Sequence, residues 1–251
     1  TFINAILSSQ NPETGMTTYF QPMATGFFKV YSSPTDHFWC CTGSGMENFS
    51  KLGDSIYFHD ENRIYVNRYT SSKVNWKEKG IEITQNADLP KVTFTVNGSG
   101  DAEIVLRVPD WCKEKPTVKI NGDKKLVRVK DGFITLHRKW KDGDVIEYEM
   151  PMSITVHPLP DNENAVAFKY GPWVLSANMG TNNMNTGTTG VNVTVPLWDT
   201  SVSETLIVEK GTINRWLRNI DENLVRIGDS FEFKLLGTNQ QLIFSPHYKQ
   251  H

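Results

Sequence analysis

Two adjacent cysteines, Cys40 and Cys41, are the residues best able to do chemistry in this sequence. They stand in residues 38–48 (FWCCTGSGMEN), where small residues lead into a predicted helix. Adjacent thiolates can reach one metal ion, and the positive end of a helix favours the deprotonated thiol. Bound zinc would lower the thiol pKa much further. The pair therefore predicts a zinc-held thiolate or, as is usual for free cysteine, two buried packing residues.

The other cysteine and the polar residues near the pair add no further ligand or catalytic group to it. A disulfide between Cys40 and Cys41 would close a strained ring and leave Cys112 without a partner. Cys112 falls in a predicted β-region, so we expect it to be a packing residue. A lone histidine is seldom a ligand, and a carboxylate near a helix start is favoured by the helix dipole alone. We therefore assign no chemical role to His37 or Glu47.

A helix and many short strands must position these residues. Apolar residues recur near helical spacing between 45 and 58, which predicts a helix there with Ser44 as its cap. After residue 60, apolar and polar residues alternate between turn signals. This pattern predicts an antiparallel sandwich over residues 63–176. Its expected buried or half-buried positions include Val66, Val105, Leu106 and Ile146.

The composition excludes several classes of function. The 26 basic and 28 acidic residues nearly cancel, and the longest basic cluster is a pair, residues 124–125. We therefore expect no nucleic acid or anionic membrane as a partner. No apolar run approaches the roughly 20 residues of a membrane helix. The first residues resemble the last turns of a helix, so we expect the chain to start inside a larger fold.

An ordered series of motifs resembles bacterial glycoside hydrolases of families 127 and 146, the cysteine-dependent β-L-arabinofuranosidases. The series starts with the cysteine pair followed by Gly-x-Gly-Met-Glu-Asn, and continues through residues 50–57 (SKLGDSIY). Further matches, in the same order, are residues 64–67 (IYVN), 75–77 (NWK), 107–111 (RVPDW), 151–152 (PM), 158–161 (PLPD) and 170–175 (YGPWVL). The resemblance covers about residues 1–176 and is weak beyond residue 180.

The resemblance implies a catalytic (α/α)6 barrel followed by β-sandwich domains. We therefore expect a mainly β chain in which residues 1–60 are a short mixed remnant of the barrel. Residues 61–178 would form the antiparallel β-sandwich, and residues 179–251 a second, small β-domain. Without the rest of the barrel, apolar surface near Phe49 and Leu52 should be exposed or covered by self-association.

The resemblance also implies a retaining mechanism with a zinc-bound cysteine nucleophile. Carried over, Cys40 is the nucleophile and Cys41 a ligand of the same zinc. Tyr19 takes the place of a tyrosine near the sugar, although β-rich regions also bury tyrosines for packing alone. A Glu-x-Cys pair and an acid/base glutamate come from earlier barrel helices, and the sequence contains no Glu-x-Cys. We therefore expect this chain alone to bind zinc weakly and to be inactive.

Three classes of function compete at this point. The first is a retaining exo-glycosidase acting on terminal L-arabinofuranose of plant glycans, for which the substrate rests on family analogy. The second is a non-catalytic carbohydrate-binding or structural sandwich module, and a binding module should show a row of exposed, coplanar aromatic rings. The third is a thiol redox protein, although the pair lacks the spacing of Cys-x-x-Cys. We expect a periplasmic or secreted location, with the cytoplasm as the alternative.

Overall fold

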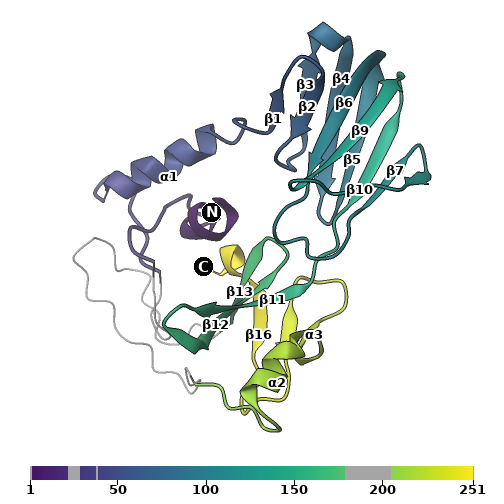
Figure 1. Cartoon of the computed structure of the whole chain (residues 1–251). Coiled ribbons are helices and arrows are strands. Elements are labelled where there is room, and N and C mark those ends of the chain that lie inside the picture. Colours follow the sequence, from purple (N-terminus) through teal and green to yellow (C-terminus); the bar gives the residue numbers. More distant parts are fainter. Residues whose placement is uncertain (1, 22–28, 38, 179–204, 251) are drawn as a thin grey trace. The chain divides into compact units, whose positions relative to one another are not determined.

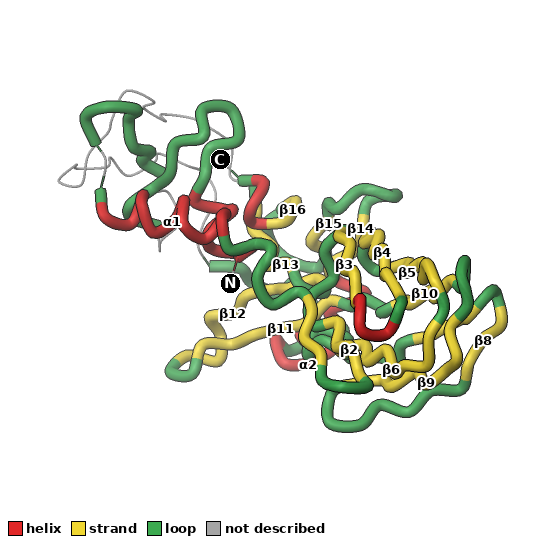
Figure 2. Tube along the Cα trace, turned by 90° about the horizontal axis from the view of Figure 1, so that it is seen from above, coloured by secondary structure: helices red, strands yellow, loops and turns green. Residues whose placement is uncertain are grey.

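The computed structural model describes residues 2–21, 29–37, 39–178 and 205–250 (Figure 1). The chain divides into two compact units. Residues 52–153 form one, called here the sandwich unit, and residues 1–51 with 154–251 form the other, called the mixed unit. Strands are the main elements of the sandwich unit, whereas the longer helices belong to the mixed unit (Figure 2). None of the helices in the described ranges is long and apolar enough to cross a membrane.

The sandwich unit consists of ten strands and one short 3-10 helix. In chain order these are β1 (Tyr57–His59), β2 (Arg63–Val66), β3 (Ser72–Trp76), η3 (Lys77–Lys79), β4 (Ile81–Asp88), β5 (Lys91–Gly98), β6 (Gly100–Arg107), β7 (Thr117–Ile120), β8 (Asp123–Lys125), β9 (Phe133–Trp140) and β10 (Val145–Glu149). One sheet has the order β1-β2-β6-β9, and the other has the order β3-β4-β5-β10-β7-β8.

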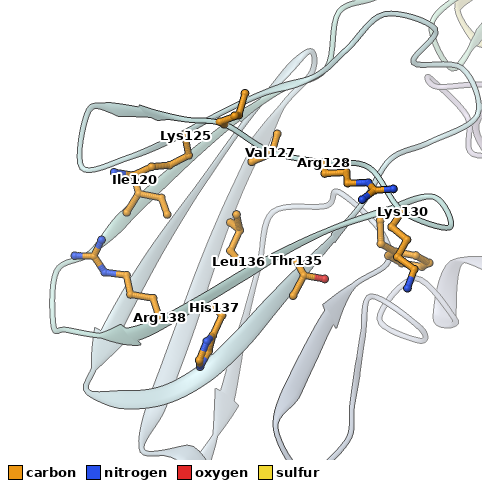
Figure 3. A pocket seen from close by; sticks show the side chains of 11 residues that line it. Ile120, Lys125, Val127, Arg128, Lys130, Thr135, Leu136, His137 and Arg138 are labelled. Carbon is orange, nitrogen blue, oxygen red and sulfur yellow. The ribbon is translucent and has the colours of Figure 1, made fainter.

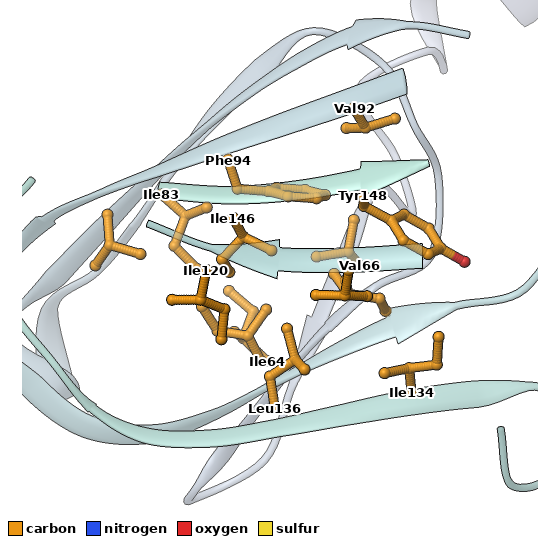
Figure 4. Packing of buried hydrophobic residues seen from close by; sticks show 14 of the residues in the cluster. Ile64, Val66, Ile83, Val92, Phe94, Ile120, Ile134, Leu136, Ile146 and Tyr148 are labelled. Atoms are coloured by element: carbon orange, nitrogen blue, oxygen red, sulfur yellow. The ribbon is translucent and has the colours of Figure 1, made fainter. Parts of the chain in front are cut away.

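Alternating side chains of the two sheets build the core of the sandwich unit (Figure 4). On β5, for example, Val92, Phe94 and Val96 are buried while the residues between them are only half-buried. Because successive side chains of a strand point to opposite faces, this alternation fills the space between the sheets. The predicted sandwich is confirmed for the strands β2 to β10. All four apolar positions expected inside it are buried: Val66, Val105, Leu106 and Ile146.

One strand pair departs from the expected antiparallel arrangement. β2 pairs with β6 in parallel, Ile64 opposite Ile104 and Val66 opposite Leu106. The strands β3, β4 and β5, which connect them along the chain, lie in the other sheet. The chain therefore crosses to the second sheet and returns in the same direction, which a simple hairpin cannot do.

The mixed unit carries a third sheet together with most of the helical segments. Its elements are η1 (Phe2–Ile6), η2 (Leu7–Ser9), α1 (Cys40–Ser50), β11 (Ile154–Leu159), β12 (Asn162–Tyr170), β13 (Trp173–Ala177), α2 (Ile213–Arg218), α3 (Ile220–Asn223), β14 (Leu224–Arg226), β15 (Phe233–Leu235), β16 (Ile243–Pro246) and η4 (His247–Lys249). The sheet is antiparallel, with the order β11-β12-β13-β16-β15-β14. Trp216 of α2 and Ile220 of α3 share a core with its buried face.

Residues 154–176 do not belong to the sandwich, contrary to the prediction. β13 pairs with β16, so that Leu175 lies opposite Pro246 and Ala177 opposite Phe244. The alternating pattern was read correctly as strands, but such a pattern does not specify a partner strand. The apolar residues Phe168 and Leu175 pack in one core with Trp216 and Phe244, which decides the pairing. The expected domain limit at residue 60 stays a prediction.

A half-buried lysine ties the two ends of the mixed unit together. The Nζ of Lys29 donates hydrogen bonds to the carbonyl oxygens of Ser8, at 2.6 Å, and Gln250, at 2.5 Å. Burial lowers the pKa of Lys29 from its ordinary 10.5 to about 8. Between these values the unfolded chain binds more protons than the folded chain, so stability should rise as pH increases from 8 to 10.5.

The lysine's contribution can be isolated with Lys29→Met. We expect wild type to gain stability relative to this variant as pH rises from 8 to 10.5. Over this range folding of wild type releases a proton from the Lys29 ammonium group, and methionine has no proton to release. Urea midpoints of both proteins at several pH values measure the difference. A difference that stays constant with pH would contradict the assignment.

Candidate functional site

The two cysteines occupy the first turn of α1, which begins earlier than predicted. The helix runs from Cys40 to Ser50, after Trp39 in an extended conformation, and no side chain caps it. Ser44, the predicted cap, lies inside the helix, where its hydroxyl donates to the Cys40 carbonyl. Ile56, counted as helical from its spacing, is instead a buried residue of the sandwich unit. The thiols therefore lie in the turn whose N–H groups lack helical partners.

The distance between the sulfurs suits a shared metal ion. Cys40 Sγ and Cys41 Sγ are 3.9 Å apart, and both residues are exposed. Two thiolates of a tetrahedral zinc site lie about 3.8 Å apart, given zinc–sulfur bonds of about 2.3 Å. The alternative of two buried packing cysteines does not describe them. It does describe Cys112, which is buried in the sandwich core as predicted.

The structure brings Tyr19 to the cysteine pair across twenty residues of sequence. The ring of Tyr19 packs edge-on against Trp39, with centroids 5.6 Å apart. Its hydroxyl lies near both thiols. Repulsion from the Cys40 sulfur, and then from Cys41, raises the pKa of Tyr19. The hydroxyl therefore keeps its proton and can donate it in a hydrogen bond.

Each thiol also affects the other. The hydrogen bond from Cys41 to Cys40 raises the pKa of Cys41, and desolvation and the charge on Cys40 act in the same direction. The hydrogen bond with Tyr19 opposes this rise by favouring the thiolate. Adjacent sulfurs resist carrying two negative charges, and a cation bound by both would remove that resistance.

The described residues supply only part of a metal site. No group of three or more His, Cys, Asp or Glu side chains within them is placed to hold a metal ion. The Nδ1 of His37 pairs with Ser33 Oγ at 3.0 Å, and Glu47 is exposed further along α1. Since zinc sites use three or four protein ligands, the pair fits as two sulfur ligands of a larger set.

Three aromatic residues on the third sheet and its loops, within the described part of the mixed unit, form a tilted cluster and not a flat binding platform. Tyr170, Trp173 and Phe231 are half-buried, and their ring planes meet at 30° to 65°. The Arg226 guanidinium lies 4.9 Å from the centre of the Phe231 ring. This cluster resembles a small core more than the coplanar exposed row typical of a sugar-binding module. Trp140 of β9 is buried in the core of the sandwich unit.

Apolar side chains on and after α1 are exposed, as expected. Met46 is 52% exposed and Leu52 is 39% exposed. Phe49 is half-buried because its ring packs edge-on against Phe2, at 5.3 Å. Exposure of Leu52 agrees with the expectation, and self-association stays a prediction. The role of Trp39 in holding Tyr19 was not recognised from the sequence, although two aromatic residues directly before the thiols are a usable signal.

Comparisons with known proteins bear on both parts of the chain. The family model of the β-L-arabinofuranosidase GH127 catalytic domain matches residues 1–54, and that of the GH127 middle domain matches residues 63–152. A search of the curated proteins found no match.

Solved structures share the fold. A GH127 β-L-arabinofuranosidase from Geobacillus stearothermophilus T6 is 23% identical, with a TM-score of 0.57 over 67% of this chain and 30% of its own. A GH127 β-arabinofuranosidase is 20% identical, with a TM-score of 0.69 over 96% of this chain and 41% of its own. A glycoside hydrolase is 18% identical, with a TM-score of 0.63 over 98% and 44%. The chain thus spans less than half the length of these proteins.

Proposed function

The chain belongs to glycoside hydrolase family 127, whose two domain models together match more than half of it, and from this premise we propose that it is the cysteine-bearing part of a retaining β-L-arabinofuranosidase. The observation that carries the proposal lies in the catalytic-domain match. There Cys40 and Cys41 lie 3.9 Å apart in the first turn of α1, beside the Tyr19 hydroxyl. The substrate class is terminal L-arabinofuranose of plant glycans.

Cys40 is the proposed nucleophile. Its sulfur attacks the anomeric carbon, the carbon–sulfur bond forms as the glycosidic carbon–oxygen bond breaks, and the leaving oxygen takes a proton from a general acid. Water then attacks the same carbon and gives a proton to the carboxylate that the first step left on the general acid, while the carbon–sulfur bond breaks and the sulfur departs as thiolate. Two inversions at one carbon retain its configuration, as in carboxylate-based retaining enzymes. The general acid is a glutamate in the part of the catalytic domain that this chain does not contain.

Cys40 and Cys41 would together hold zinc, with the remaining ligands from the same missing part. Bound zinc would keep the thiolate ionised at neutral pH and temper its basicity, so that sulfur can both attack and leave. The 3.9 Å separation of the two sulfurs supports this assignment. Tyr19 would donate its hydroxyl to the sulfur or to a sugar hydroxyl while its ring stays packed on Trp39. A periplasmic or secreted location suits an enzyme acting on plant glycans.

The test compares this chain with a longer protein that includes the whole catalytic domain. We expect the longer protein to hold one zinc per chain and to release L-arabinose from a synthetic β-L-arabinofuranoside. Removal of the metal by a chelator should abolish the release, and added zinc should restore it. The 251-residue chain alone should hold little zinc and release none. Full activity after complete removal of zinc would contradict the metal assignment.

A further inference from the structure

The sandwich unit contains a cavity of about 510 Å³ between two edge strands (Figure 3). Among the described strands β8 pairs with β7 and β9 with β6, and each of them is the last strand of its sheet. The connecting residues between β8 and β9 form part of the lining, and Ile120 and Leu136 of the core lie at its base. A cavity of this size falls within the range of small-ligand sites.

The charged side chains that line this cavity are all cationic: Lys125, Arg128, Lys130 and Arg138. Neither aspartate nor glutamate is among the lining residues. Figure 3 draws Arg128 and Lys130 at one end of the cavity and Arg138 at the other. The lining therefore has the charge that suits an anionic ligand.

Two of these cations have no carboxylate partner within the described part of the chain. Asp144 pairs with Arg138 at 3.2 Å, Asp101 with His137 at 3.1 Å, and Asp123 with Lys125 at 3.7 Å. By contrast, Arg128 and Lys130 form no ion pair with any residue that the structure describes. An arriving carboxylate could bind both without displacing an existing partner.

A tight turn fixes the segment that carries these two cations. Lys130 and Phe133 exchange backbone hydrogen bonds of 2.9 Å across Asp131 and Gly132, whose φ angles are 52° and 79°. Two successive positive φ angles are typical of the type I′ hairpin turn. Val127 packs against the sandwich core from the same segment. The two cations are thus held on a folded scaffold, which lowers the entropic cost of binding.

The cavity also offers apolar contact next to its charge. Phe133 is half-buried in the lining, where Tyr65 supports its ring edge-on at 6.1 Å. Leu126, another lining residue, is 97% exposed. A sugar ring has apolar C–H faces that pack on such side chains, while free inorganic anions have none.

We propose that this cavity binds a carboxylated oligosaccharide, independently of the cysteine chemistry. Arg128 and Lys130 hold the carboxylate through charge-assisted hydrogen bonds, and Phe133 and Leu126 contact the apolar face of the ring. The choice of a saccharide rests on the proposed glycosidase function. The choice of an acidic one rests on the lining alone.

Calorimetric titration of the 251-residue chain with trigalacturonate at low salt tests the proposal. We expect saturable 1:1 binding, weakened about 10-fold or more in the Arg128→Ala/Lys130→Ala variant, because both charge-assisted contacts are lost. The matched control is Lys113→Ala/Lys115→Ala, which removes the same charge from exposed residues of this unit outside the cavity. The control should bind as wild type does. Should the first variant fail to fold, the single change Arg128→Gln replaces it.

Three results would overturn the proposal. Equal binding of a neutral arabinotriose would show that the charge is irrelevant, and equal binding of inorganic phosphate would show a site for small anions only. Equal weakening in the Lys113→Ala/Lys115→Ala control would show nonspecific attraction. The Cys40→Ser chain should still bind trigalacturonate. If the longer protein with the whole catalytic domain shows no glycosidase activity while the 251-residue chain still binds trigalacturonate, the proposed function fails and this site stands. If activity is present and trigalacturonate does not bind, this site fails and the proposed function stands.

Discussion

Replacing Cys40 by serine, in a protein that includes the whole catalytic domain, is expected to reduce release of L-arabinose by a factor on the order of 10³ or more. A neutral hydroxyl is a far poorer nucleophile than a metal-bound thiolate, and an alkoxide would be a poorer leaving group in the second step. The fold should survive, because Cys40 is exposed in the first turn of α1 and supports no core.

The other two cysteines provide the controls for this experiment. Cys41→Ser should lower zinc content and reduce activity indirectly, through loss of a metal ligand. Cys112→Ala should leave kcat near that of wild type, because Cys112 is buried in the sandwich core. The measurements are kcat and zinc content of each purified protein, with circular dichroism to check folding. Full activity in Cys40→Ser would remove the mechanism.

Phe94→Ala should cost the sandwich unit about 3–5 kcal/mol of unfolding free energy. Phe94 lies on β5, its side chain is fully buried, and its ring packs edge-on with that of Tyr69 at a centroid distance of 6.4 Å. Truncation would leave a cavity between the two sheets. Backbone hydrogen bonds join the strands within each sheet, so the sheets cannot collapse freely around the cavity.

Phe58→Ala is the matched control for this loss. Phe58 lies in the same unit on β1 but is 52% exposed, so its truncation should cost less than about 1 kcal/mol. Urea unfolding of the 251-residue chain, followed by tryptophan fluorescence, measures both variants. Because the chain has two compact units, the transition of the sandwich unit should shift while that of the mixed unit stays in place. Equal losses in the two variants would argue against Phe94 as a core residue.

Features that depend only on neighbouring residues, such as the buried face of a strand, could be predicted from the sequence. The alternation along β5 predicted which side chains face the core, because the period of a strand is a local property. The adjacency of Cys40 and Cys41 is covalent, so the sequence alone brought both thiols to one turn of a helix. The start of that helix differs from the prediction because the residue before it, Trp39, is extended and provides no side-chain cap that the sequence could signal.

Contacts between segments far apart in the sequence could not be predicted from it and become visible in the fold. Tyr19 reaches the thiols because its ring packs on Trp39. β13 pairs with β16 instead of joining the sandwich, and the cationic cavity exists because the edge strands β8 and β9 face it from different sheets. A hydrophobic period indicates which face of a segment is buried, but it does not identify the segment that packs against that face. The partner is chosen by packing among residues far apart in sequence, where many local patterns are equally compatible and only one arrangement fills the core.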